Sequence, residues 1–355
     1  MNASVWDTYP TTYRGETVSA ILRAVSAGES FVIVGLSGSG KSNLMGFLAH
    51  RVTQGPQFVL VDCNRLRGGQ PEDLLRLIHQ ALDQEPGPGD LLFSLEDLIG
   101  SKLAKQPRSL CLLLDRFDSL PEEAMPAIAG NLRSLRDSFK YRLTFGIASR
   151  RPLPEDTELN ELFYGNTFWL GPLSQDDARW SAKQYARRRG IEWDDSLIDK
   201  MTEISWGYPS LLRGVCEAAA TDAPLDVDSL HDHPAVKRRV DEFWRDAPDA
   251  DAVRLSGLKD HPLLSEHQPL VPPDASQLTA SEYALYSYFL AHTGQICTHD
   301  ELIKAVWKEE ERIEGVRDDR LAQLVRRLRA KVEADPANPQ LIQTVPGRGY
   351  RYSAN

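Results

Sequence analysis

Cysteine and long apolar runs are both scarce in this chain of 355 residues. It has four cysteines, spaced too far apart for a C-x-x-C pair. This spacing argues against a disulfide framework or a zinc site and fits reduced thiols in a cytosolic protein. No apolar run approaches the roughly 20 residues that span a bilayer, and the N-terminus lacks the basic and then apolar pattern of a signal peptide. We therefore expect a cytoplasmic protein that does not contact a membrane.

Positive charge is also in short supply. The chain has 41 lysines and arginines against 51 aspartates and glutamates, which gives a net charge of −10. This balance excludes a global basic field that attracts nucleic acid, so any DNA contact must come from a local patch. The content of 41% hydrophobic and 26% charged residues argues against wholesale disorder, collagen-like repeats and a coiled coil. At roughly 100–200 residues per domain, the length predicts two or three domains.

Short apolar runs of β type alternate with amphipathic helical stretches in residues 10–173. Near-continuous apolar runs, separated by helix-length segments, predict an α/β fold with a parallel sheet covered by helices on both faces. The expected strands are Phe31–Val34, Phe58–Asp62, Leu110–Leu114, Arg142–Ala148 and Thr167–Leu170.

The rest of the chain divides into three parts. Residues 174–260 have a mostly helical pattern, with Ser174 and Asp177 spaced like an N-terminal cap. Residues 261–276 are rich in proline and polar side chains and predict a linker. Residues 277–355 predict a compact domain with its own helices and a terminal hairpin.

The sequence G-x-x-x-x-G-K-S occupies Gly35–Ser42, between an apolar strand and the helical pattern Asn43–Val52. Glycines at these positions let the backbone turn inward, so that its amides face phosphate oxygens. Lys41 neutralises the β- and γ-phosphates in such a loop, and Ser42 offers a hydroxyl to Mg²⁺. We therefore predict a binding site for ATP or ADP with Mg²⁺. Its expected nucleotide-binding residues are Gly35, Ser37, Gly38, Ser39, Gly40, Lys41, Ser42 and Asn43.

A second apolar strand ends at Asp115 and is followed by Arg116 and Asp118. In a phosphate-loop protein the aspartate at such a strand end holds Mg²⁺, so Asp115 and Ser42 are the predicted metal residues. The alternative is a core strand that ends in a surface aspartate. Arg150 follows another strand and can reach a γ-phosphate from there, although an exposed arginine at a strand end is common. The expected catalytic residues are Lys41, Asp115, Asp118 and Arg150.

Together these motifs resemble the STAND class of P-loop ATPases, which are signal-transducing relatives of AAA+ proteins, over about residues 10–225. The class combines a phosphate loop, a strand ending in D-x-x-D, a sensor arginine after the fourth strand and a helical lid with a G-x-P turn beside the adenine. The resemblance implies a switch in which ADP holds a closed form, and ATP with a trigger opens it and promotes self-association. The matching residues outside the loop are Asp115, Asp118, Arg150, Gly207 and Pro209.

Two departures from the pattern bear on activity. Many hydrolysing AAA+ proteins carry glutamate directly after the strand-end aspartate, as the base for the attacking water, and Arg116 occupies that position here. The resemblance therefore implies slow hydrolysis unless Asp118 takes the role. The segment Tyr13–Glu16 is similar to the G-R-E motif of the class, but in scrambled order.

The C-terminal domain contains two capping boxes, Thr279 with Glu282 and Thr298 with Glu301. In this pattern the threonine caps the helix amides and the glutamate reaches back. The boxes predict helices over residues 280–292 and 299–307, and a third helix runs over about 318–333 with one apolar face and a basic outer face. Two β-type runs at 341–345 and 350–352 surround a glycine turn and predict a hairpin.

Three helices followed by a hairpin predict a winged helix-turn-helix domain. Its sequence motifs are similar to those of the OmpR/PhoB-type effector domain: L-T-x-x-E at the start, R-R-L-R-x-K at Arg326–Lys331 and I-x-T-V-x-G-x-G-Y at Ile342–Tyr350. In that family the third helix enters the major groove of DNA and the hairpin arginine enters the minor groove. The resemblance implies that Gln323, Arg326 and Arg327 face bases. It assigns backbone or wing contacts to Arg320, Arg329, Lys331, Thr344, Arg348 and Arg351.

The family also has a short sheet before its first helix, and a phosphoacceptor receiver domain as its usual partner. The proline-rich linker stands where that sheet is expected, so the sheet is predicted to be truncated, and the ATPase replaces the receiver as input.

His231 and His233 in a polar stretch are predicted to be solvated rather than to bind a metal.

Three functional hypotheses remain open at this point. The first is a bacterial transcription regulator in which ATP binding changes self-association and winged helices then bind repeated sites on double-stranded DNA, with a protein or ligand as trigger. The second is an ATPase that acts on DNA, similar to origin-recognition initiators. The third is a STAND-type defence sensor that uses the winged helix as a protein adaptor.

Overall fold

The protein is seen here in a computed structural model. It describes residues 5–66, 70–87, 89–153, 157–163, 165–246, 256–258, 260–265, 278–307, 316–333, 338–346 and 348–353. The chain divides into two compact units, Met1–Leu263 and Leu264–Asn355. None of the helices described is long and apolar enough to cross a membrane.

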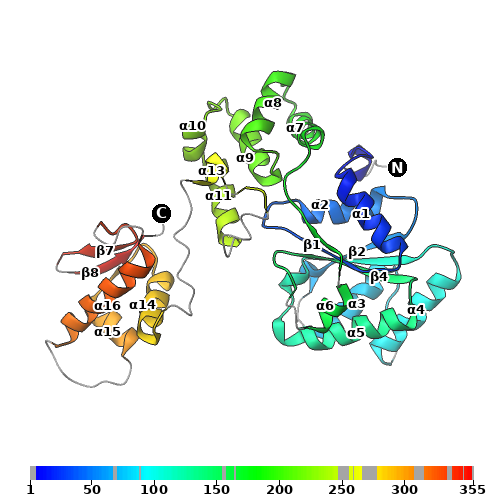
Figure 1. Ribbon diagram of the computed structural model, residues 1–355, viewed down its shortest axis with the longest axis horizontal. Helices are drawn as coiled ribbons and strands as arrows, with labels where there is room; N and C mark the ends of the chain where they lie inside the picture. Colours follow the sequence, from blue (N-terminus) through cyan, green and yellow to red (C-terminus); the bar gives the residue numbers. More distant parts are fainter. Residues whose placement is uncertain are drawn as a thin grey trace. The chain divides into compact units, whose positions relative to one another are not determined.

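The first unit is built on a sheet of five parallel strands among the described residues, in the order β2-β3-β4-β1-β5. Figure 1 shows it at the centre of this unit. Each strand overlaps a predicted one, and no end differs by more than one residue, so the predicted α/β fold with a parallel sheet is confirmed. The strands are β1 (Phe31–Val34), β2 (Gln57–Asp62), β3 (Leu110–Asp115), β4 (Leu143–Ser149) and β5 (Thr167–Trp169).

Helices cover both faces of this sheet, with α1 and α2 on one face and α3, α5 and α6 on the other (Figure 1). Strands β3 and β4 are buried along their whole length, as expected of central strands in a parallel sheet. Alternate residues such as Leu112 and Phe145 form one core with α3 to α6. The α-helices are α1 (Gly15–Ser26), α2 (Lys41–Arg51), α3 (Pro71–Ala81), α4 (Leu91–Ala104), α5 (Met125–Ser138) and α6 (Glu158–Phe163). Short 3-10 helices are η1 (Val5–Thr8), η2 (Cys63–Arg65), η3 (Phe117–Ser119) and η4 (Glu122–Ala124).

A helical lid follows the sheet. The Ser174 side chain accepts a hydrogen bond from the Asp177 amide, which confirms the predicted cap of its first helix. The predicted linker is wrong in its first five residues, because 262–265 form helix α13, and Leu263 and Leu264 are buried. Residues 266–276 of that prediction lie outside the described residues. The lid helices are α7 (Gln175–Arg189), α8 (Asp195–Ile204), α9 (Pro209–Ala219), α10 (Val227–Asp232), α11 (Pro234–Asp246) and α13 (Pro262–Ser265).

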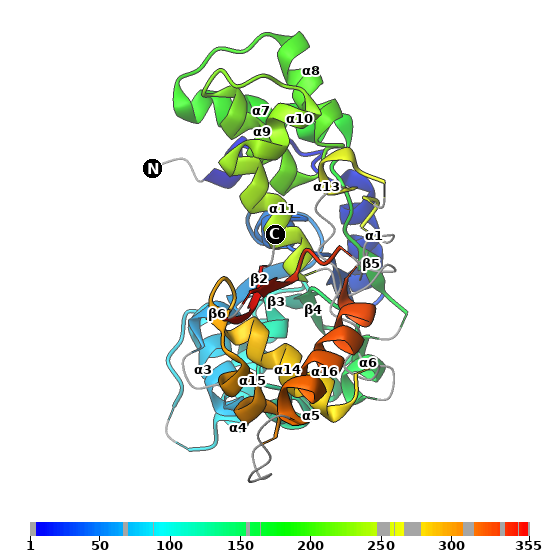
Figure 2. The same ribbon diagram turned by 90° about the vertical axis from the view of Figure 1, so that its left-hand side faces the viewer.

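The second unit packs three helices against a small antiparallel sheet in the order β6-β8-β7 (Figure 2). Both predicted capping boxes are present, and the hairpin is confirmed. Strand β6 was not predicted, because a run of two residues carries no periodicity. The expected sheet before the first helix falls on residues outside those described. The elements are α14 (Ala280–Ala291), β6 (Ile296–Cys297), α15 (His299–Val306), α16 (Val316–Val332), β7 (Ile342–Val345) and β8 (Gly349–Tyr352).

The core of this unit confirms the predicted apolar face of the third helix. Its buried members on α16 are Leu321, Leu324, Val325, Leu328 and Val332, which contact side chains of α14, α15 and the sheet. The outer face of α16 is therefore set by what this core leaves exposed.

Candidate nucleotide site and basic helix

The phosphate loop joins β1 to α2 and ends in an open helix start. Gly38 and Gly40 have φ angles of 76° and 92°, a region that favours glycine. Helix α2 begins at Lys41, and its N-cap Gly40 has no side chain to satisfy the first amides. Such amides and the helix dipole attract anions. A cavity of about 400 Å³ lies at this loop.

The cavity brings together residues predicted from four separate stretches of sequence. Gly35, Ser39 and Gly207 are not among its lining residues, although Gly35 lies in the loop and its carbonyl accepts a hydrogen bond from the Lys41 ammonium. The Gly207 carbonyl accepts one from the Leu173 amide at 2.9 Å. The predicted residues that line the cavity are Ser37, Gly38, Gly40, Lys41, Ser42, Asn43, Asp115, Asp118, Arg150 and Pro209.

Asp115 and Ser42, the predicted metal residues, meet at the end of β3. Asp115 is 7% exposed, and burial raises the pKa of its carboxyl. Hydrogen bonds from the Ser42 hydroxyl and the Arg116 amide partly offset this effect. The part of the chain described holds no cluster of three metal-ligating side chains. One carboxylate and one hydroxyl fit Mg²⁺, which usually keeps waters and takes substrate phosphate oxygens as further ligands.

Asp118 and Arg150 form an ion pair beside this group. The Arg150 Nε lies 2.5 Å from Asp118 Oδ2, and the Arg150 amide donates to the same oxygen at 3.3 Å. The carboxylate that sequence analysis offered as an alternative base is therefore neutralised by a guanidinium. Arg116 has a left-handed backbone with φ 55°, and its guanidinium donates to Asn64 Oδ1 at 3.3 Å.

The lid supplies side chains that sequence analysis missed. The Ser210 amide donates to the Gly38 carbonyl at 3.1 Å, and the Tyr208 hydroxyl donates to the Ser37 carbonyl at 2.8 Å. These bonds fasten the start of α9 to the phosphate loop. Ser210 and Arg213 could have been found from the sequence, because they lie in the first turns of the helix predicted to begin near Pro209. No motif in the sequence pointed to Arg239 of α11. The unpredicted lining residues are Asn64, Arg116, Ser119, Ser210, Arg213 and Arg239.

Arg14, in the segment similar to the G-R-E motif, lies behind the loop rather than in the cavity lining. It is 8% exposed and has a left-handed backbone with φ 45°. Its guanidinium donates to the carbonyls of Ser39 at 2.8 Å and Gly171 at 3.1 Å, and its amide donates to the Asp177 carboxylate. Arg14 therefore joins the phosphate loop to the start of the lid.

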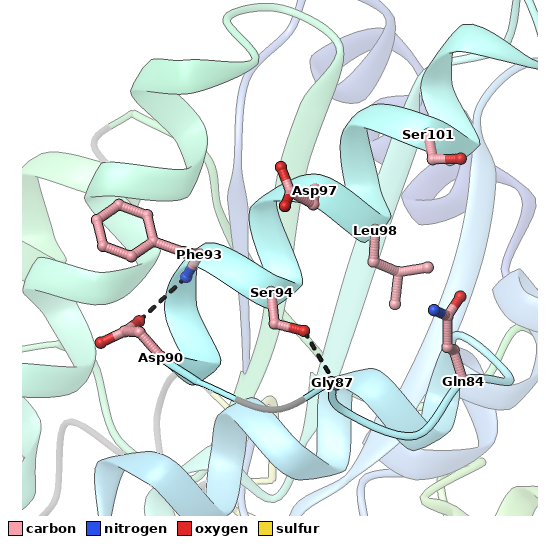
Figure 3. Close-up of a pocket in the computed structure, with 8 residues that line it drawn as sticks. All are labelled: Gln84, Gly87, Asp90, Phe93, Ser94, Asp97, Leu98 and Ser101. Atoms are coloured by element: carbon pink, nitrogen blue, oxygen red, sulfur yellow. Dashed lines mark hydrogen bonds between the residues drawn. The ribbon is translucent and has the colours of Figure 1, made fainter.

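A second hollow of about 440 Å³ opens beside α4 (Figure 3). The Ser94 hydroxyl accepts a hydrogen bond from the Gly87 amide and lies 3.2 Å from His79 Nε2, while Asp90 caps α4. Among its described lining residues there is no lysine or arginine, so it lacks the cationic side chains that favour phosphate at the first cavity. The lining residues are Gln84, Gly87, Asp90, Phe93, Ser94, Asp97, Leu98 and Ser101.

The outer face of α16 presents Arg320, Gln323, Arg326 and Arg327, all exposed. These residues lie opposite the buried leucines of the same helix, as the helical period predicts. Arg348 near the hairpin turn and Arg351 on β8 are also exposed, and the Arg351 guanidinium donates to Gln343 Oε1 at 2.8 Å.

Arg329 is used inside the domain. Its guanidinium donates to the Ile342 carbonyl and, at 2.9 Å, to the Thr344 hydroxyl. It also lies 5.7 Å from the centre of the Tyr350 ring. Arg329 therefore joins α16 to the hairpin, and the DNA contacts expected of Arg329 and Thr344 stay predictions.

Lys331 is also engaged within the domain, in an ion pair with Glu282 at 2.7 Å. Glu282 is 2% exposed. Burial opposes its ionisation, but hydrogen bonds from Lys331 and Thr279 outweigh burial and hold its pKa below the ordinary value. Lys331 therefore balances a buried charge at the start of α14.

The prediction of solvated histidines is wrong for His231, which is 7% exposed at the end of α10. His233 is half-buried, and its Nδ1 accepts a hydrogen bond from the Ala235 amide at the start of α11. Both histidines thus belong to the junction between α10 and α11.

Comparison with known families finds two matches along the chain. The family described as "Transcriptional regulatory protein, C terminal" matches residues 274–352, and the family described as "AAA domain" matches residues 25–148. The matches fall in the second and first units respectively.

Comparison with curated proteins finds relatives that match parts of the chain. The sensory transduction protein RegX3 of Mycobacterium leprae (strain TN) is 36% identical over 161 residues, which cover 44% of this chain and 72% of that protein. RegX3 of Mycobacterium tuberculosis (strain ATCC 25618 / H37Rv) is 36% identical over 89 residues, 25% of this chain and 37% of its own length. Protein PetR of Rhodobacter capsulatus is 40% identical over 76 residues, 21% of this chain. The chain spans about a third of the length of the last two.

Among solved structures, a Walker-type ATPase of Pyrococcus abyssi aligns with 99% of this chain and 97% of its own, at a TM-score of 0.43 and 15% identity. The Aeropyrum pernix Orc1 protein in complex with DNA aligns with 99% of this chain and 93% of its own, at a TM-score of 0.44 and 14% identity. Similarity this low carries no argument about function.

Proposed function

Because this chain belongs to the family of transcriptional regulators that includes the sensory transduction protein RegX3, and also carries an AAA-type domain, we propose that it is a nucleotide-switched DNA-binding regulator. ATP binding in the first unit controls self-association and the binding of the winged helix to promoter DNA. ADP and ATP are the alternative ligands of the switch, as in the STAND class that its motifs resemble.

The observation that carries this proposal is the composition of the cavity at the phosphate loop. Among its described lining residues are five basic side chains and two acidic ones, an excess of three positive charges in a chain of net charge −10. The basic ones are Lys41, Arg116, Arg150, Arg213 and Arg239. An open helix start and a cationic cavity suit a phosphate chain.

We assign roles on this geometry. Lys41 neutralises the phosphates, and Ser42 with Asp115 holds Mg²⁺, which would supply further charge neutralisation when bound. Arg150, oriented by Asp118, reads the terminal phosphate. The Gly207–Pro209 turn places the lid against the nucleotide through the contacts of Tyr208 and Ser210 with the loop.

Hydrolysis is slow in this proposal. The position after Asp115 is a guanidinium that cannot accept a proton from water, and Asp118 is paired with Arg150. A slow hydrolase keeps ATP bound for long periods, which suits a switch.

In the second unit, Gln323, Arg326 and Arg327 on the exposed face of α16 read base edges in the major groove, where arginine suits guanine and glutamine suits adenine. Contacts to the DNA backbone and minor groove come from Arg320, Arg348 and Arg351.

The test is retention of fragments of the host genome by the full-length chain, loaded with ADP or with a slowly hydrolysed ATP analogue. We expect a few promoter fragments to be enriched in one nucleotide state, and the Lys41→Ala variant to lose that difference. Equal recovery in both states would contradict the switch. No enrichment in either state would favour the winged helix as a protein adaptor instead.

A further inference from the structure

Three arginines of the lid surround one carboxylate, that of Glu217 on α9. Arg213 Nε lies 2.6 Å from Glu217 Oε1, Arg238 Nη2 lies 3.5 Å from Oε2, and Arg239 Nη2 lies 3.8 Å from Oε1. Arg239 also contacts Glu242 at 3.2 Å on its own helix. Both α11 arginines lie farther from Glu217 than the length of a charge-assisted hydrogen bond, which is shorter than 3 Å, and Glu242 is the nearer partner of Arg239.

Two of the three arginines also face the nucleotide cavity. Arg213 and Arg239 line it together with the phosphate loop, whereas Arg238 does not, and its side chain is 60% exposed. Arg239 is 22% exposed, and its Nε is buried without a hydrogen-bond acceptor among the described residues.

Close packing of α9 and α11 directs Arg239 to this place. A Cβ at Gly214 of α9 would lie 3.3 Å from Arg239 Cγ and 3.2 Å from the Ala235 carbonyl oxygen. Glycine at this position lets α11 lie close, so that the stem of Arg239 passes over α9 toward the cavity. Its buried Nε has no acceptor among the described residues, so the guanidinium can bind a further anion.

We propose that Arg239 of α11 binds the phosphate chain of the nucleotide in competition with its two carboxylate partners, Glu242 and Glu217. The proposal rests on the nucleotide binding proposed above and extends it to α11. Helix α11 comes after α9, which contacts the phosphate loop, and before the segment that leads to the second unit. Nucleotide binding would therefore hold α11 at the site through a side chain of its own.

The test is titration of the full-length chain with a fluorescent, slowly hydrolysed ATP analogue. We expect Arg239→Gln to weaken affinity at least tenfold, and Arg239→Lys to restore part of it. The matched control Arg238→Gln removes the neighbouring guanidinium from the same carboxylate and should change affinity less than twofold. Glu217→Gln should strengthen binding severalfold, because one of the two competing carboxylates is gone.

Amide hydrogen exchange of residues 234–246 gives a second readout. The analogue should slow exchange there in the wild-type chain and in Arg238→Gln but not in Arg239→Gln. Equal affinities of Arg239→Gln and Arg238→Gln for the analogue would overturn the proposal. Weaker binding by Glu217→Gln would show that Glu217 does not compete with phosphate for Arg239. If the wild-type chain binds no nucleotide, the proposed function itself fails. If the wild-type chain binds the analogue and Lys41→Ala does not, wild-type affinity of Arg239→Gln would refute the role of Arg239 and leave the proposed function standing.

Discussion

The phosphate loop and the basic helix α16 were both predicted from cationic motifs, and the structure treats them differently. In the first unit, residues from distant stretches of sequence gather around one cavity. In the second, residues from one short motif separate: Arg326 and Arg327 are exposed, while Arg329 and Lys331 bind groups of their own domain.

The difference follows from what places the side chains. The cavity at the phosphate loop lies where parallel strands end and a helix begins, so backbone topology brings its residues to the same edge of the sheet. On a helix surface, each residue turns by about 100° from the last, and its use depends on which partners lie beside it. A local motif therefore predicts the first kind of site better than the second.

The largest effect is expected from a substitution of Gly38, in the phosphate loop. A Cβ at this position would lie 2.3 Å from the Cβ of Ser210, in a residue with φ +76°. We expect Gly38→Ala to lower nucleotide affinity about 100-fold, because strain in the left-handed region costs about 1–2 kcal/mol and the overlap about 1–3 more. Binding of the ATP analogue by calorimetry measures this loss.

Gly55 is the matched control for that prediction. It has φ +77°, but no atom lies within 4 Å of an added Cβ. Gly55→Ala should carry the backbone strain alone and bind nucleotide with wild-type affinity. If both variants bound nucleotide equally well, close approach of the lid to the loop would not matter for binding.

The next effect tests the exposed face of α16. Arg327→Ala should weaken specific DNA binding by about 10- to 30-fold, since one arginine contact to a base contributes about 1–3 kcal/mol of discrimination. Fluorescence anisotropy with a retained promoter fragment measures it. Arg76→Ala, which removes an arginine side chain that is 53% exposed in the first unit, should leave DNA affinity unchanged.

A smaller effect on stability distinguishes Arg329 from its exposed neighbours. Arg329→Ala removes donors to Ile342 and Thr344, and hydrogen bonds of a charged group contribute about 1.5–3 kcal/mol. We expect the free energy of unfolding of the second unit to fall by about 2 kcal/mol, as followed by urea titration, with less loss of DNA affinity than in Arg327→Ala. Wild-type stability together with an equal loss of DNA affinity would favour the predicted DNA contact of Arg329 over a structural role.

The sheet, the phosphate loop and the winged helix could thus be predicted from the sequence, because periodicity and backbone motifs are local. Arg239 could not be predicted as a residue of the cavity, because it lies on a helix about 200 residues along the chain from the loop. Nor could the pairing of Glu282 with Lys331 be predicted, because it joins two helices whose contact depends on the tertiary fold. The sequence pattern also placed His261 in a linker, since proline content alone cannot reveal that a neighbouring helix covers a segment.

The smallest effect is expected in the pH dependence of stability, and it tests the burial of His261. His261 is fully buried, its ring lies 4.8 Å from the ring of Trp206, and its Nδ1 accepts a hydrogen bond from the Leu263 amide. Burial lowers its pKa to about 4, and the nearby His231 acts in the same direction.

The unfolded chain takes up this proton near pH 6.5, whereas the folded chain takes it up only near pH 4, so stability falls as the pH drops below about 6.5. Between pH 7 and 5.5 we expect this group to lower the free energy of unfolding by about 1 kcal/mol. His261→Asn keeps an acceptor for Leu263 but does not titrate in this range. Urea titrations of both chains at the two pH values should therefore show a smaller decrease in the variant. Equal decreases would mean that His261 is not buried against Trp206 in solution, and the predicted linker would begin where the sequence placed it.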